Sequence, residues 1–207
     1  MSEFIYDTYN SIVYEQIAPH SRVLDVGCAT GRLGEALAAK DCICSGIEID
    51  AGAAARAKAH YPGGVFVLDL DDEQALAQLK LPSSFDYVVF ADILEHLRRP
   101  ERALELLGRF LAVSGTIVCA IPNIAYWRRR LMLLRGDWTY EETGICDRTH
   151  LRFFTETSAR ELVRAAGLRV QDLAYQGLGG TLQRVKRRFP RLFASGFVIR
   201  AVRPQAG

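Results

Sequence analysis

The segment VLDVGCATG (23–31) joins an acidic residue to a glycine turn at the end of an apolar run. The run ends in Asp25 and turns through Gly27 and Gly31 into a helical pattern. Glycine lets the backbone approach a bound ligand closely. An aspartate buried at such a crevice must be hydrated or bound by a polar ligand. The turn therefore predicts a ligand site.

Two further acidic residues follow apolar runs. Glu48 ends the run in GIEID (46–50), and Asp69 ends the run in VLDLDD (67–72). A carboxylate about 20 residues beyond a glycine turn can accept hydrogen bonds from both hydroxyls of a ribose. Asp69 can accept a hydrogen bond from an adenine amino group. Together these residues favour a nucleoside-containing ligand.

The glycine spacing does not fit a dinucleotide cofactor. The pattern G-x-G-x-x-G needs glycines where Ala29 and Arg32 stand. A nicotinamide-dependent oxidoreductase is therefore the weaker alternative.

These residues must be positioned by a regular alternation of strands and helices. Strand-like runs with helical stretches between them are typical of a doubly wound α/β fold with a mostly parallel sheet. After Pro122 the rhythm changes to a basic helical stretch (123–136), a polar loop and a helix at 155–166. The expected strands before that point are 22–26, 42–48, 65–69, 85–91 and 115–122, and the expected helices are 31–40, 52–60, 72–79 and 100–112.

The three motifs, followed by FDYVVFADILEHL (85–97) and GTIVCAIPN (115–123), resemble the class I S-adenosylmethionine-dependent methyltransferases over about residues 20–123. The resemblance implies a Rossmann-like sheet of seven strands, with LRVQDLAY (168–175) sixth and an antiparallel FVIRAVR (197–203) seventh. We expect one domain over residues 1–207, with a core at about 20–123, substrate-side additions at 124–196 and the last strand at 197–203.

The same resemblance implies where S-adenosylmethionine binds. The glycine turn would lie under its methionine part and Glu48 at its ribose, with Asp69 and Leu70 at its adenine and Asp92 near its methionine end. Ala29 replaces a glycine usual in the family, and alanine tolerates most backbone conformations other than positive φ. The expected cofactor-binding set is Asp25, Gly27, Cys28, Ala29, Gly31, Glu48, Ile49, Asp69, Leu70 and Asp92.

The segment DRTHLRFFTETSARELVRAAG (147–167) resembles the D-x-x-H-L-R-F-F-T signature of a methyltransferase subgroup associated with saccharides and secondary metabolites. A histidine over the cofactor can take a hydroxyl proton during methyl transfer, so His150 is the expected general base. Alternatively, His150 and Arg152 only order the loop before a helix capped at Thr155, with Glu156 or Ser158 assisting.

A metal site is a further alternative. Asp92-x-x-Glu95-His96 is similar to the E-x-x-E-H metal site of ubiquinone-biosynthesis O-methyltransferases, although Asp replaces the first Glu. The E-H-L sequence also ends this strand in metal-independent relatives, so we expect no bound metal.

Charge is unevenly distributed along the chain. Residues 1–122 have a formal charge of −7 and residues 123–207 one of +9. The basic part is either a solvated face or a site for an anionic acceptor, and its aromatic segment WRRRLMLLRGDW is a candidate lid. For RVKRRFPR (184–191) we favour solvent or phosphate over a membrane surface. A pI of 8.3 argues against a nucleic-acid partner.

Composition sets the remaining expectations. No apolar run approaches the roughly 20 residues that cross a bilayer, and the first residues lack the order of a signal peptide. Five cysteines without a C-x-x-C pair favour a reducing cytoplasm. We expect O-methylation of a small hydroxylated acceptor, such as a saccharide or its nucleotide- or lipid-linked form. A noncatalytic S-adenosylmethionine-binding module and N- or C-methylation stay open, as does the oligomeric state.

Overall fold

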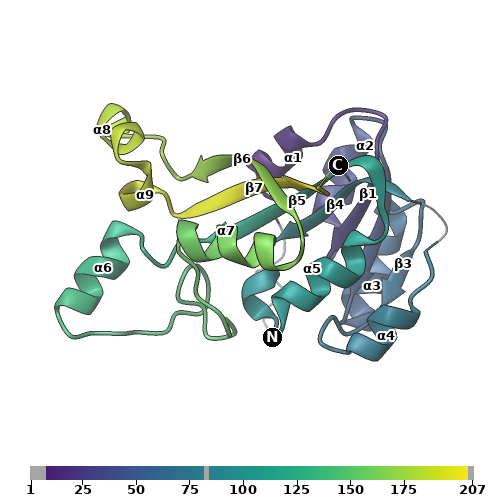
Figure 1. Ribbon diagram of the computed structural model, residues 1–207, viewed down its shortest axis with the longest axis horizontal. Helices are drawn as coiled ribbons and strands as arrows, with labels where there is room; N and C mark the ends of the chain where they lie inside the picture. Colours follow the sequence, from purple (N-terminus) through teal and green to yellow (C-terminus); the bar gives the residue numbers. More distant parts are fainter. Residues whose placement is uncertain (1–7, 82–83, 205–207) are drawn as a thin grey trace.

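A seven-stranded sheet forms the centre of the protein (Figure 1). The computed structural model describes residues 8–81 and 84–204. The strand order is β3-β2-β1-β4-β5-β7-β6, with β7 antiparallel to both of its neighbours and β1 to β5 mutually parallel. The strands are β1 (Arg22–Val26), β2 (Ile43–Glu48), β3 (Val65–Val67), β4 (Phe85–Ala91), β5 (Leu111–Pro122), β6 (Arg169–Gln176) and β7 (Gly196–Val202).

The predicted doubly wound fold with an antiparallel last strand is confirmed. Two strands differ from their expected bounds by more than one residue. β3 ends at Val67 instead of residue 69, because the chain turns at Asp69, whose Oδ1 accepts a hydrogen bond from the Asp71 N–H at 2.8 Å. β5 begins earlier than predicted, at Leu111, and pairs with Phe85 before a register shift.

Helices cover both faces of the sheet and bury an apolar cluster on each. Leu76, Leu104 and Val163, from α4, α5 and α7, lie in the larger cluster. Val13 and Leu37, from α1 and α2, lie in the second. The helices are α1 (Ser11–Gln16), α2 (Arg32–Ala38), α3 (Ala51–Ala57), η1 (Lys58–His60), α4 (Glu73–Gln78), η2 (Leu94–His96), α5 (Pro100–Gly108), α6 (Trp127–Leu134), α7 (Glu156–Ala165), α8 (Gln183–Arg188) and α9 (Pro190–Phe193).

Side-chain caps define where several helices begin. Asn10 caps α1, and Asp72 caps α4 by accepting hydrogen bonds from the second and third backbone N–H groups of that helix. The predicted cap of α7 is confirmed: Thr155 and Ser158 form a reciprocal capping box. The loops before α1 and α7 both contact the segment that follows β4, through Asn10 to Asp92 and through Leu151 and Arg152 to Glu95.

Three helices in the C-terminal part contribute no buried residue. They are α6, α8 and α9, which lie beyond the sheet at one end of the molecule (Figure 1). The predicted helix at 123–136 shortens to α6, because the Asn123 side chain bonds the Ala125 N–H and keeps the chain irregular there. Within the described residues, the structure has no helix long and apolar enough to cross a membrane.

Candidate cofactor and acceptor site

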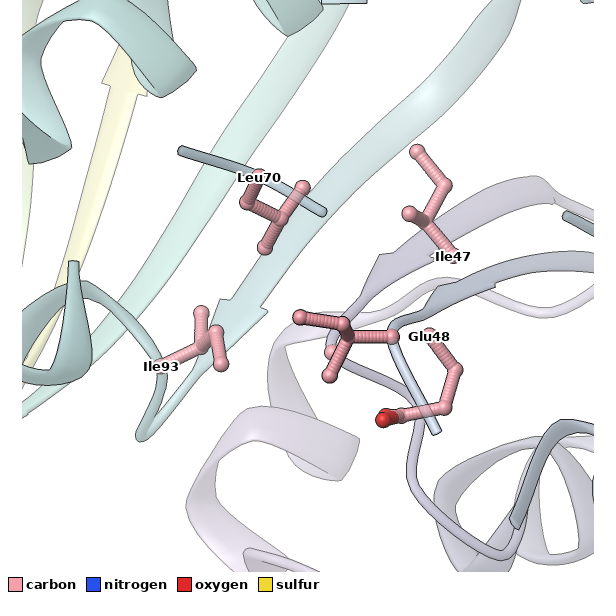
Figure 2. Close-up of a pocket in the computed structure, with 6 residues that line it drawn as sticks. Ile47, Glu48, Leu70 and Ile93 are labelled. Carbon is pink, nitrogen blue, oxygen red and sulfur yellow. The ribbon is translucent and has the colours of Figure 1, made fainter. Parts of the chain in front are cut away.

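A pocket lies at the carboxyl ends of the parallel strands, where doubly wound sheets bind ligands. Its volume is about 280 Å³, including space open to solvent. Figure 2 shows Leu70 and Ile93 on one side of it and Ile47 and Glu48 on the other. Apolar side chains beside one carboxylate suit a flat heterocycle attached to a hydroxylated sugar. The lining residues are Gly27, Ile47, Glu48, Ile49, Leu70 and Ile93.

The Glu48 carboxylate is held in place by two backbone groups. Its Oε2 accepts a hydrogen bond from the Ala29 N–H and its Oε1 one from the Asp50 N–H, each at 2.9 Å. A carboxylate has about four acceptor positions, so two remain. Glu48 is thus oriented before any ligand binds and can still accept hydroxyl hydrogens.

The glycine loop beside Glu48 is closely packed. Gly27 has φ +75°, and a Cβ there would lie 2.8 Å from the Ile93 side chain. Gly31 has φ +93°, and a Cβ there would lie 2.9 Å from the Ala57 Cα. Only glycine fits both positions without displacing a neighbour.

Ala29 is the exception in this loop, because it is not a glycine and yet has φ +47°. We expected an alanine here to avoid positive φ, and that expectation is wrong. The left-handed conformation turns the Ala29 N–H toward Glu48 and costs an alanine about 1 kcal/mol. An alanine at this position therefore costs stability relative to a glycine.

Asp25 has a protein partner, contrary to the prediction that it needs water or a ligand. Its Oδ2 accepts a hydrogen bond of 2.5 Å from the Tyr61 hydroxyl, and that hydroxyl accepts one from the Gly34 N–H. Burial raises the pKa of Asp25 to about 6, opposed by the Tyr61 hydrogen bond. Cys28 is also buried beside it, and burial raises the pKa of its thiol. A direct cofactor contact by Asp25 or Cys28 stays a prediction.

The residues expected at the adenine separate in the structure. Leu70 is buried and lines the pocket, whereas Asp69 is exposed and lies outside the pocket lining. The Asp69 Oδ1 closes a turn by accepting from the Asp71 N–H, and a contact between Asp69 and adenine stays a prediction. Ile49 is 62% exposed and lines the pocket, so a ligand would cover it.

Asp92 begins a second polar group after β4. It has φ +53°, and its Oδ2 accepts a hydrogen bond of 3.3 Å from the Asn10 side chain. Although the residue is exposed, neighbouring protein atoms reduce the hydration of its carboxyl group and raise its pKa, while Asn10 and His150 lower it. The cap residue of α1 is thereby tied to the expected methionine end of the site.

Glu95 and His150 lie next to Asp92. Glu95 is 1% exposed, its Oε1 lies 3.8 Å from Nε2 of His150, and its Oε2 has no hydrogen-bond partner among the described residues. Burial, with Asp92 second, raises the pKa of Glu95 well above its usual range. Glu95 is therefore harder to ionise than an exposed glutamate.

The hydrogen bonds of two histidines define their tautomers. Nδ1 of His150 lies 3.2 Å from the Ile145 carbonyl oxygen, which only accepts, so this nitrogen holds the proton. Thr149 donates its hydroxyl hydrogen to Asp147, so Nδ1 of His96, 3.1 Å away, donates to Thr149. In both neutral rings Nε2 is left as the basic nitrogen.

The loop that contains His150 is fixed to the end of β4. The N–H groups of Leu151 and Arg152 donate to the Glu95 carbonyl at 2.8 and 3.0 Å, and the Arg152 guanidinium donates to the Arg98 carbonyl. Arg152 thus orders the loop, as one alternative expected. Glu156 takes no part in the α7 cap and instead accepts hydrogen bonds from Arg160, Tyr175 and Arg191.

The donor atoms of Glu95, His96 and His150 lie within 4.8 Å of one another, close enough to share a cation. This set differs from the sequence pattern, because Asp92 bonds Asn10 and His150 takes its place. Methyl transfer itself does not require a metal.

The profile of a family described as "Methyltransferase domain" matches residues 3–173. The chain belongs to this family. The ubiquinone biosynthesis O-methyltransferase of Aeromonas salmonicida is 24% identical over 157 residues, which are 74% of this chain and 65% of that protein. The match to the Pseudomonas entomophila enzyme of the same name is 26% identical, over 73% of this chain and 66% of that protein. The chain thus aligns with about two thirds of these relatives.

Solved structures share the methyltransferase fold. A S-adenosylmethionine-dependent methyltransferase from Archaeoglobus fulgidus superposes with a TM-score of 0.66 at 20% identity, over 92% of this chain and 89% of that one. The [4+2]-cyclase SpnF superposes with a TM-score of 0.64 at 17% identity, over 95% and 80% of the two chains. Family and fold imply S-adenosylmethionine as the cofactor, while the cyclase shows that this fold also occurs with another reaction.

Several residues of the methyltransferase site were missed from the sequence. Tyr61 lies outside the recognised motifs, and Ile93 lies within FDYVVFADILEHL without a predicted role; only the packed structure brings them to Asp25 and Gly27. The sequence pattern indicates Glu95 only as a metal ligand. A glutamate followed by histidine in the apolar stretch FADILEHL was the available signal that a buried polar group stands there.

Proposed function

We propose that this methyltransferase domain methylates a hydroxyl group of a small acceptor, such as a saccharide or its nucleotide- or lipid-linked form. The observation that supports O-methylation is the state of His150. Its Nδ1 proton is bound by the Ile145 carbonyl, which leaves Nε2 as a base beside Asp92 and Glu95. A hydroxyl loses its proton during methylation, so it needs such a base.

The pocket fits S-adenosylmethionine by the chemistry of its lining. Glu48 would accept the ribose hydroxyls, Ile49 and Leu70 would cover the adenine, and the close-packed Gly27 turn would pass beneath the methionine part. The bound cofactor supplies a methyl group activated by a positively charged sulfur. The remaining expected contacts, from Asp25, Cys28, Ala29, Gly31, Asp69 and Asp92, belong to the same proposal.

The chain's own contribution to the reaction is to orient the acceptor and move one proton. His150 would accept the hydroxyl proton at Nε2 when the methyl group moves from the cofactor sulfur to the acceptor oxygen. A positively charged His150 lowers the pKa of Asp92, so the Asp92 carboxylate would stabilise the imidazolium that forms. No covalent enzyme intermediate is needed.

The test is transfer of labelled methyl groups from S-adenosylmethionine to a panel of sugars, nucleotide sugars, phenols and amines. We expect labelled product with hydroxylated acceptors and its loss in His150→Ala, with cofactor binding retained. Labelled product from amines alone, or equal rates in the variant, would contradict O-methylation with His150 as base.

A phenolic acceptor is the second candidate. The relatives in ubiquinone biosynthesis are O-methyltransferases, and aromatic rings continue from His150. The Phe153 ring lies 6.3 Å from the His150 ring and 5.2 Å from that of Trp138. Aromatic side chains bind both sugars and phenols, and the acceptor panel separates the two.

We further propose one domain over residues 1–207, acting in the cytoplasm. The cysteines support a reducing compartment, because all five are free and buried in the structure: Cys28, Cys42, Cys44, Cys119 and Cys146. Fractionation of the native cells, with antibody detection of the chain, tests the location.

A further inference from the structure

The helices α6, α8 and α9 form a cationic arm (residues 124–136 and 182–193) that packs no side chain into the core. Short helices are marginal in water unless an apolar face is covered. Yet Leu133 and Leu134 of α6 are 52% and 82% exposed, and Phe189, next to α8, is 56% exposed. The arm therefore presents apolar side chains that nothing among the described residues covers.

Both parts of the arm leave the sheet at the same place. Pro122 at the end of β5 pairs with Gly196 at the start of β7. The chain therefore leaves the sheet toward α6 at the same place where it returns from α9. The Asn123 side chain joins the two connections by donating to the Ala194 carbonyl oxygen at 2.8 Å. Figure 1 shows α6, α8 and α9 together at the end of the molecule away from α3 and α4.

The charge of the arm is of one sign. α6, α8 and α9 contain no acidic residue. Glu141 pairs with Arg129 and Glu156 with Arg191, which removes two of the positive charges. No ion pair found among the described residues neutralises the others, which are Arg128, Arg130, Arg135, Arg184, Lys186, Arg187 and Arg188.

We infer that the arm docks on the surface of an anionic lipid bilayer. Arginines bind lipid phosphates while neighbouring leucine and phenylalanine side chains enter the boundary between headgroups and acyl chains. A nucleic acid would use the arginines and leave the leucines in water. A second copy of the arm would be repelled by the same charge. The bilayer is the occupant that uses both features, and the docking does not depend on the proposed reaction.

The test is co-sedimentation of the full chain with phosphatidylcholine vesicles, with and without phosphatidylglycerol. We expect binding only to the anionic vesicles, weakened by added salt but not by equimolar free glycerol phosphate. Removing two charges with Arg187→Gln and Arg188→Gln should weaken binding more than tenfold, at roughly fivefold per arginine. Arg56→Gln, an exposed arginine on α3, is the charge control and should retain binding.

The apolar contribution is tested with Leu133→Ser and Leu134→Ser together, which should weaken binding about tenfold. Val113→Ser is the matched control, since Val113 is 97% exposed near the opposite end of β5. All variants should keep the wild-type melting temperature, because none of these side chains is buried.

Several results would overturn the inference. They are absence of binding to anionic vesicles, binding unchanged by the leucine substitutions, and competition by free glycerol phosphate. Concentration-dependent dimerisation that the leucine substitutions abolish would do so too, because the arm would then cover a second copy of the chain.

Discussion

Two polar groups meet at the same edge of the sheet and differ in how completely their atoms are paired. In the first, Asp25 accepts from Tyr61, and both oxygens of Glu48 accept from backbone N–H groups. In the second, Glu95 has a buried oxygen without a partner, and Nε2 of His150 is 3.8 Å from the nearest Glu95 oxygen. Paired groups fix a binding surface, whereas unpaired buried groups remain available for chemistry.

The largest effect should come from the second set of residues, which contains Glu95 and His150. Replacing His150 with Ala removes the proposed base, and we expect kcat to fall by about 10² to 10⁴ with cofactor affinity within a factor of about 3. Steady-state rates and calorimetry measure the two quantities. Equal losses of rate and cofactor affinity would instead assign His150 to the binding surface and remove the contrast.

The next effect concerns Asp25, in the first set of residues, and is a change with pH in the free energy of unfolding. The pKa of Asp25 is about 6 in the folded protein against 3.8 for an ordinary aspartate. The folded state therefore holds more protons between these values, and its free energy of unfolding falls as pH rises through them. The fall is about 3 kcal/mol by the standard conversion.

Asp25→Asn lacks this titration and keeps an oxygen for Tyr61. We expect the variant to gain about 3 kcal/mol relative to the wild type between pH 4 and pH 7, measured by urea unfolding at each pH. A difference independent of pH would show that Asp25 is hydrated, and not sealed against Tyr61.

Glu48 should show a smaller effect, limited to binding. Glu48→Ala removes charged hydrogen bonds to the ribose, and we expect affinity for S-adenosylmethionine and S-adenosylhomocysteine to fall about 10- to 100-fold in calorimetric titration. Glu48→Gln keeps one acceptor oxygen and should lose less. Unchanged affinity in both variants, with the fold intact, would contradict the cofactor site.

The smallest effect is expected at Ala29. Ala29→Gly relieves the left-handed conformation and should raise the free energy of unfolding by about 0.5 to 1 kcal/mol, measured by urea unfolding. The same substitution at Ala55, exposed within α3, should lower it by about 1 kcal/mol. Destabilisation at both positions would mean that Ala29 is not strained.

The sequence by itself determined the succession of strands and helices along the chain, the glycine turn, the position of Glu48 after its strand and the capped helix that begins after Thr155. These features depend on neighbours along the chain: apolar runs, turn residues and caps act over a few positions. Only the tertiary structure decided that Tyr61 pairs with Asp25, that Asn10 reaches Asp92 and that His150 lies beside Glu95. These contacts join residues 36, 82 and more than 50 positions apart, and only the packing of the sheet and its loops brings such residues together.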